Sequence, residues 1–193
     1  MAIDLRTIKL AKQLVNYSLA VKHDENVIIS GSTEATDLIT ALYAEILKVG
    51  GHPVLRLTLP NLGPIFYKYA KEHHIKNFPD IFDYTVRHAQ KYIGIDTESN
   101  TREMSTVDPR RMAERGKIVR PISDYIVNEK DKIRRCTVGY PCLALAQEAE
   151  MSMHDFEDFM FTAMLQDWKK LGAEIDRVLK VFRKGRSVHL IGK

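Results

Sequence analysis

The sequence predicts an α/β fold: a mainly parallel sheet with helices on both faces, in a Rossmann-like three-layer arrangement. Short apolar runs rich in β-branched residues, which are typical of strands buried on both faces, alternate with segments whose apolar residues recur at helical spacing. Turn residues and helix caps separate the two kinds of segment. Because strands that alternate with helices form parallel sheets with right-handed crossovers, this order indicates such a sheet.

The first half of the chain contains an opening helix followed by two strand and helix units. Polar residues end the opening helix, and a pair of glycines ends the helix after the first strand. The expected elements are a helix from Ile8 to Leu19, a strand at Val27–Ile29, a helix capped by Ser32 or Thr33 and closed by Gly50 and Gly51, a strand at Val54–Leu59, and a helix with Ile65, Phe66, Tyr69 and Ala70 on its apolar face.

The second half predicts two further strands and three helices. The expected elements are a strand at Tyr92–Asp96, a helix that starts at Asp108 and Pro109, a strand at Arg135–Val138, a helix capped by Ser152, and a helix with Trp168, Leu171, Ile175, Val178, Leu179 and Phe182 on one face. Asp155 would close a capping box with Ser152, and the helix would bury Phe156, Phe159, Met160 and Ala163. The last helix is expected to pack in the core and to stop at Gly185 in a left-handed conformation.

The expected domain organisation is one α/β domain over residues 1–185 and the beginning of a second unit. Ser187–Ile191 reads as a short strand, after which only two residues remain. We interpret residues 186–193 as the first strand of a missing domain, so that this chain is the amino-terminal domain of a longer, truncated protein.

The composition excludes several classes of protein. No apolar stretch approaches the ~20 residues of a membrane-spanning helix, and the first residues do not resemble a signal peptide, so we expect a cytoplasmic protein with no membrane partner. The net charge is +4, but lysine and arginine alternate with acidic residues, and the basic run 130–135 has no aromatic ladder. We therefore expect no nucleic-acid partner. Cys136 and Cys142 are too few for a disulfide framework, and both are interpreted as structural.

The sequence contains none of the common catalytic motifs. The turn Ser30–Thr33 follows a strand but lacks a glycine-rich phosphate motif, and Glu34 and Asp37 place negative charge at the helix start. The sequence contains no HExxH and no GxSxG, and the best pair of metal ligands is His154 with Asp158. Only Asp96 and Glu98 stand at the carboxyl end of a predicted strand, where open α/β sheets bind ligands.

The clearest likeness to a known family is carried by the run Asn100–Arg110, which reads NTREMSTVDPR. It resembles the segment N-x-R-x-(L/M)-S-x-V-D-P-x-R of the thermophilic metallo-aminopeptidases known as aminopeptidases T, S and II. Other stretches resemble the first domain of that family in the same order: Leu14–Leu19 followed by Val27–Ile29, Gly139–Pro141 leading to Leu145–Ala149, and Met151–Ser152 through Phe156–Phe159.

The resemblance implies a cytoplasmic, homodimeric exopeptidase that removes amino-terminal residues from peptides. Two divalent metal ions, of the zinc or cobalt type, would polarise the scissile carbonyl and activate water. In this family the glutamate, histidine and aspartate ligands lie in the second domain, so the resemblance assigns no catalytic residue and no metal ligand to this chain. We therefore expect this chain alone to bind no metal cofactor and to be inactive as a peptidase. Glu98, Asn100 and Tyr140 are the expected rim of the substrate cleft.

Two other functions remain open. The chain can be a stand-alone α/β binding or assembly domain that has the fold without peptidase chemistry. A nucleotide-binding α/β module is the third alternative, and it predicts that ATP or NAD raises the melting temperature.

Overall fold

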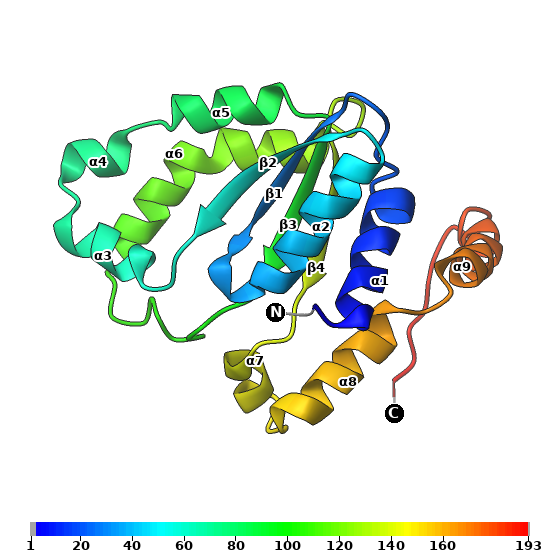
Figure 1. Ribbon diagram of the computed structural model, residues 1–193. Coiled ribbons are helices and arrows are strands. Elements are labelled where there is room, and N and C mark those ends of the chain that lie inside the picture. The colour runs from blue at the N-terminus through cyan, green and yellow to red at the C-terminus, as the bar shows by residue number, and fades with distance from the viewer. Residues whose placement is uncertain (1–2, 193) are drawn as a thin grey trace.

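The computed structural model describes residues 3–192, and its centre is a four-stranded parallel sheet in the order β2-β1-β3-β4 (Figure 1). The strands are β1 (Asn26–Ser32), β2 (His52–Thr58), β3 (Lys91–Asp96) and β4 (Arg134–Gly139). Each of the four strands predicted from a β-branched run is confirmed, with ends that differ by a few residues. The predicted α/β class with a parallel sheet is therefore confirmed.

The central strand β1 explains why helices must cover both faces of this sheet. Val27 and Ile29 belong to one hydrophobic cluster, and Ile28 between them belongs to another. All three side chains are completely buried. Since successive side chains of a strand point to opposite faces, each face needs its own helical layer.

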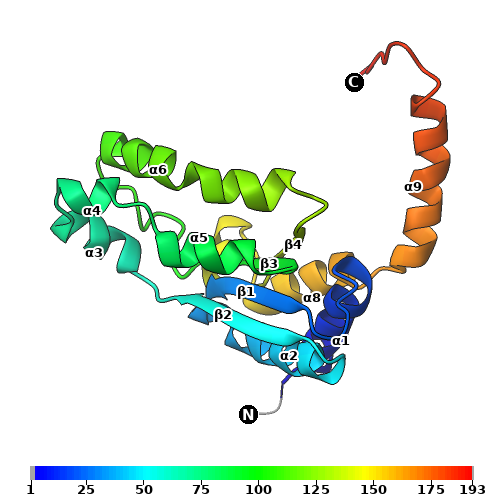
Figure 2. The ribbon, with the colours of Figure 1, turned by 90° about the horizontal axis from the view of Figure 1, so that it is seen from above.

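One face is covered by α1 (Leu5–Gln13) and its π-helical continuation Leu14–Ser18, by α2 (Thr36–Lys48) and by α8 (Met153–Met164). Figure 2 shows α1 and α2 on one side of the sheet and α5 and α6 on the other. The core of this layer is apolar and tightly buried, with Leu10, Val15, Leu38, Leu42 and Phe161 packed against Ile93 and Ile95 of β3.

The second face is covered by α5 (Asp80–Arg87) and α6 (Pro109–Asn128). Ile28 of β1 packs there with Val86 and Ala89, which lie in and just after α5, and with Ile122 of α6. Two shorter helices, α3 (Leu62–Tyr69) and α4 (Glu72–Lys76), precede α5 and lie near α6. The expected three layers are present.

Three helix caps predicted from the sequence are confirmed by hydrogen bonds. Ser32 Oγ accepts from the amide of Glu34 at 3.3 Å and begins the 3-10 turn Thr33–Ala35 that leads into α2. Asp108 Oδ1 accepts from the amide of Arg110 at 2.9 Å. Ser152 Oγ accepts from the amide of Asp155 at 3.2 Å. In the predicted capping box the Asp155 carboxylate accepts from a backbone amide, whereas here it accepts from the Ser152 hydroxyl at 2.7 Å. At the other end of α2, Gly50 takes a φ of 81°, as a closing glycine should.

The buried face of α8 differs from the prediction. Phe156 and Phe161 are buried, whereas Phe159 is 60% exposed and Ala163 is exposed too. The reason is that α8 touches the body along one narrow stripe, where the Phe161 ring packs edge-on against Tyr140 and beneath the guanidinium of Arg6. A short segment, α7 (Leu143–Glu148), links β4 to this helix.

The last helix, α9 (Trp168–Phe182), forms as predicted but does not enter the core. It stands away from the sheet in Figure 2, none of its residues is buried, and Phe182 is 55% exposed. Its start is held by Tyr17, whose hydroxyl donates to the Trp168 carbonyl at 3.0 Å. The expected core packing of this helix is therefore wrong. The left-handed cap at Gly185 is also wrong, since its φ is not positive.

The strand expected at Ser187–Ile191 is absent. Residues 187–192 have no regular secondary structure, and Ile191 is 96% exposed. A strand requires a neighbouring strand to satisfy its backbone groups, and the described residues offer none at this place. The assignment of residues 186–193 to a second domain therefore stays a prediction.

Candidate functional site

A crevice lies where β1, β2 and β3 reach their carboxyl ends. From β1 the chain continues to β2 on one side of β1, whereas β3 and β4 lie on the other side of β1. The direction in which strands are added to the sheet therefore reverses between β1 and β3. This switch point is where open α/β sheets bind ligands. The first hollow there has a volume of 320 Å³ and is lined by Ser30, Gly31, Ser32, Arg56, Thr58, Tyr92, Gly94, Ile95, Asp96, Thr97, Glu98 and Leu145.

A second hollow of 300 Å³ adjoins the first. The two share Ser32, Thr58, Thr97 and Glu98, and we call them together the carboxyl-end crevice. The second hollow is walled by residues 58–63 and by residues 97–104, which include the start of the NTREMSTVDPR run. The segment that carries the family resemblance therefore borders this crevice.

Charged groups of both signs line the crevice without pairing. Arg56 lies on the β2 side, and Asp96 and Glu98 lie on the β3 side. Arg56 donates from Nη1 to Ser30 Oγ at 3.3 Å, and its Cζ lies 3.9 Å from the centre of the Phe82 ring. Within residues 3–192, none of these three charged side chains makes an ion pair shorter than 4 Å.

Two buried hydroxyl side chains line the crevice. Ser30 is 8% exposed and Thr97 is 7% exposed. The Ser30 hydroxyl accepts the hydrogen bond from Arg56, but Thr97 Oγ1 has no hydrogen-bond partner among the described residues. An unsatisfied buried hydroxyl costs about 1–3 kcal/mol, which makes Thr97 an uncommon feature of a folded protein.

The structure brings together two of the three residues predicted to form the substrate rim. Glu98 and Asn100 both line the second hollow. Asn100 Oδ1 accepts from the amide of Arg102 at 3.0 Å, and Thr101 Oγ1 donates to Glu148 at 2.7 Å, so the loop is held in place at both positions.

Tyr140, the third predicted rim residue, lies apart from them. Its hydroxyl is 3.1 Å from Thr7 Oγ1, which is completely buried in α1, and its ring meets Phe161 edge-on at 6.3 Å. Burial raises the pKa of the Tyr140 phenol, and nearby carboxylates raise it further, while the hydrogen bond with Thr7 acts in the opposite direction. Tyr140 joins β4 to α1 and does not line either hollow of the crevice.

A pH-dependent loss of stability should follow from Tyr140. Because its pKa is raised above 10.0 in the folded protein, the unfolded chain ionises first as the pH rises. The stabilisation is therefore complete below pH 10.0 and is lost as the pH passes through the folded pKa. We expect Tyr140→Phe to lower stability by about 1 kcal/mol at neutral pH and to flatten the decline of the melting temperature above pH ~10. Tyr69→Phe, on a ring that is 69% exposed, is the control, and an equal effect of both substitutions would contradict this role.

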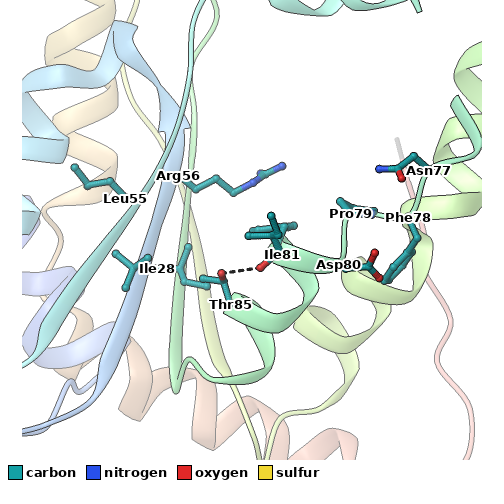
Figure 3. Close-up of a pocket in the computed structure, with 11 residues that line it drawn as sticks. Ile28, Leu55, Arg56, Asn77, Phe78, Pro79, Asp80, Ile81 and Thr85 are labelled. Atoms are coloured by element: carbon teal, nitrogen blue, oxygen red, sulfur yellow. Dashed lines mark hydrogen bonds between the residues drawn. The ribbon is translucent and has the colours of Figure 1, made fainter. Parts of the chain in front are cut away.

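A larger hollow lies elsewhere, between β2 and the start of α5. It has a volume of 510 Å³ and is mostly apolar, with Ile28, Leu55, Phe78, Pro79, Ile81 and Phe82 among its lining residues. Figure 3 shows Arg56 extending from β2 toward the segment 77–81, and the hydrogen bond from Thr85 Oγ1 to the Ile81 carbonyl at 2.8 Å. Arg56 therefore borders both this hollow and the carboxyl-end crevice.

The described residues do not form a metal centre. Residues 3–192 contain no group of three or more histidine, cysteine, aspartate or glutamate side chains placed to hold an ion. His154 Nε2 is 3.8 Å from Asp158, as the spacing suggested, but Asp158 is also paired with Arg6 at 2.5 Å. Burial raises the pKa of the Cys136 thiol, which disfavours the thiolate needed for metal binding or nucleophilic attack.

Sequence reasoning missed Arg56 and Thr97 as site residues. Both adjoin residues that were singled out, since Arg56 lies in a predicted strand and Thr97 separates Asp96 from Glu98. A charged residue between Leu55 and Leu57 was the one available signal. Nothing in the sequence shows that the Thr97 hydroxyl has no partner.

A comparison with solved structures agrees with the fold. The wild-type AmpT from Thermus thermophilus has a similar structure, with a TM-score of 0.68 and 14% sequence identity over 86% of this chain. The match covers 44% of the AmpT chain, so this chain spans less than half of that protein's length. No match was found among curated protein sequences. Within residues 3–192, no helix has the length and apolar character needed to cross a bilayer.

The family model of the thermophilic metalloproteases (M29) matches residues 4–191, which is almost the whole chain. This match includes the crevice, the acidic residues Asp96 and Glu98 of its first hollow, and the NTREMSTVDPR run. The chain therefore belongs to the thermophilic metalloprotease (M29) family.

Proposed function

We propose that this chain is the amino-terminal portion of a metal-dependent aminopeptidase, an exopeptidase that releases amino-terminal residues from peptides. The observation that carries the proposal is the match of the M29 family model over residues 4–191. The similar fold of AmpT from Thermus thermophilus, of which this chain covers 44%, supports the view that the chain corresponds to one part of a longer enzyme.

The catalytic ions would be held outside this chain. The family implies divalent metal, and we propose two ions of the zinc or cobalt type. Residues 3–192 do not fit such a centre, since no three histidine, cysteine, aspartate or glutamate side chains lie where they could hold one ion together. By this proposal the chain alone cleaves no peptide.

The chain would contribute the substrate-facing wall of the enzyme. Glu98 and Asn100 border the second hollow of the carboxyl-end crevice, on a loop fixed by hydrogen bonds to Arg102 and Glu148. A carboxylate at this place suits the free ammonium group of a peptide substrate. We propose Glu98 and Asn100 as rim residues, and Tyr140 as a residue that holds the β4 end of the wall through Thr7. The complete enzyme is proposed to be a cytoplasmic homodimer.

The alternative is a stand-alone α/β binding domain without peptidase chemistry. It is favoured by one observation, the presence of a well-formed crevice in a chain whose described residues offer no metal centre.

Sequencing the DNA beyond the codon for Lys193, and expressing the longer product, separates the two functions. We expect an open frame that encodes further glutamates and histidines. Its product should hydrolyse a leucine anilide in the presence of zinc or cobalt and lose that activity when a chelator removes the metal. A stop codon directly after Lys193, or a longer product without activity at any metal concentration, would contradict the proposal.

A further inference from the structure

Three unpaired charges in the first hollow of the carboxyl-end crevice form a pattern that a ligand can satisfy. Arg56 presents a guanidinium from β2, while Asp96 and Glu98 present carboxylates at and just after the end of β3. All three line the same hollow of 320 Å³, yet no ion pair within 4 Å joins them in the described part of the chain. A guanidinium and two carboxylates that line one hollow without pairing can each bind a ligand group of opposite charge. A molecule with one positive and one negative group suits this arrangement.

We propose that this hollow binds a free α-amino acid as its zwitterion. The ligand's carboxylate would pair with Arg56, whose planar guanidinium matches a carboxylate with two parallel hydrogen bonds. Its ammonium group would lie at Asp96 and Glu98. The guanidinium of Arg56 is held at the border of this hollow, because it lies over the Phe82 ring and donates to Ser30.

The unpartnered hydroxyl of Thr97 points to a ligand independently of the charges. Thr97 is more than nine-tenths buried, lines this hollow, and has no hydrogen-bond partner for Oγ1 in residues 3–192. Protein interiors rarely leave a buried hydroxyl unsatisfied. Because Oγ1 has almost no accessible surface, the Thr97 side chain must rotate before a ligand whose polar end enters between the ends of β1 and β3 supplies the missing partner.

The remaining walls suit a small ligand with an apolar side chain. Gly31 and Gly94 add no side chain to the floor, and a Cβ on Gly31 would come within 3.0 Å of the Ile95 Cβ. Tyr92, Ile95 and Leu145 give the hollow its apolar surface. Most of the other lining residues are polar or charged, so the hollow combines an apolar wall with polar ones.

The class of ligand is deduced from the charged residues that line the hollow. The proposed function adds only the source of this ligand, because an aminopeptidase releases free amino acids. Binding requires neither a metal nor peptide cleavage. A failure of binding in this chain and a failure of peptidase activity in the longer product are therefore separate results.

The experiment titrates this chain with L-leucine and follows its backbone amide signals by nuclear magnetic resonance. We expect saturable shifts at Gly31, Gly94 and Thr97. Leucine amide lacks the carboxylate and N-acetyl-leucine lacks the ammonium group, so each should bind at least about tenfold more weakly. Equal affinity for all three compounds, or no saturable shift at the crevice, would overturn the proposal.

Three variants test the named side chains. Arg56→Met removes the guanidinium that lies over Phe82 but keeps an unbranched side chain, and it should weaken leucine binding about tenfold, while the matched Arg135→Met on β4 should leave it unchanged. Thr97→Val removes the hydroxyl without changing the shape. It should weaken binding several-fold while the melting temperature stays the same or rises, because an unsatisfied buried group has been removed. A lower melting temperature with unchanged binding would show a purely structural hydroxyl and overturn the role of Thr97.

Discussion

Replacement of Arg111 by alanine is expected to lower the free energy of unfolding by about 3 kcal/mol and to release α3 from α6. Arg111 lies in the first turn of α6, directly after the NTREMSTVDPR run. Its guanidinium donates from Nη1 to the Tyr67 carbonyl and from Nη2 to the Ala70 carbonyl, each at 2.5 Å. Both carbonyls belong to the end of α3, where the helix has no internal partners for them. One cation therefore satisfies two backbone acceptors at the negative end of a helix.

Chemical denaturation and hydrogen exchange measure this effect. Amides of residues 62–76 should exchange faster in Arg111→Ala, because α3 and α4 lose a main attachment to α6. Arg110→Ala is the matched control, since its exposed side chain makes no hydrogen bond within the described residues, and it should change stability by less than about 0.5 kcal/mol. Arg111→Lys should fall between the two because an ammonium group cannot reach both carbonyls in the same fork geometry. Equal stability of the two alanine variants would contradict the role given to Arg111.

The start of α6 also gives a physical reason for the end of the NTREMSTVDPR run, which Arg111 follows directly. Asp108 caps α6, Pro109 occupies its first turn, and Arg111 holds the preceding helix pair in place. These residues follow the loop 97–104, whose Glu98 and Asn100 line the second hollow together with Ser32 at the end of β1.

The sheet and the helix starts could be predicted because their signals are local. Val27–Ile29 is β-branched and completely buried, and Ser32, Asp108 and Ser152 each cap a helix through an amide within three residues. Such features depend on backbone preferences and short hydrogen bonds, which the sequence displays directly.

The burial of amphipathic helices could not be predicted in the same way. The apolar stripe of α9 is as regular as that of a core helix, yet no residue of α9 is buried. Helical spacing shows that a face is apolar but does not identify what covers it. Phe159 and Phe161 in α8 differ for the same reason, since the choice between them depends on the position of Arg6 and Tyr140.

The sequence indicated where in the fold a candidate site would lie, but it indicated only some of the residues that line it. Asp96 and Glu98 were located because strand ends in parallel sheets are common ligand sites. Arg56 was not, because its approach to the crevice depends on the pairing of β2 with β1, where Arg56 stands beside Ser30. Tyr140 was expected at the rim because it follows a strand, but its hydroxyl turns to Thr7.

The second large effect concerns metal and catalysis. The described residues contain no group of three ligands, and the one pair, His154 with Asp158, is exposed and shared with Arg6. A hydrolytic centre of two ions needs several donors that converge on each ion. We therefore expect this chain, at saturating zinc or cobalt, to show no hydrolysis of a leucine anilide above the rate of buffer with the same metal. His154→Ala should leave both metal content and rate unchanged.

Equilibrium dialysis of this chain against zinc and against cobalt, followed by metal analysis and the anilide assay on the same sample, tests the central claim most directly. The claim is that these residues form a substrate-facing α/β domain and that the catalytic ions are bound elsewhere. It predicts less than one tightly bound ion per chain and no turnover. Two ions held per chain, with hydrolysis that a chelator abolishes, would contradict it.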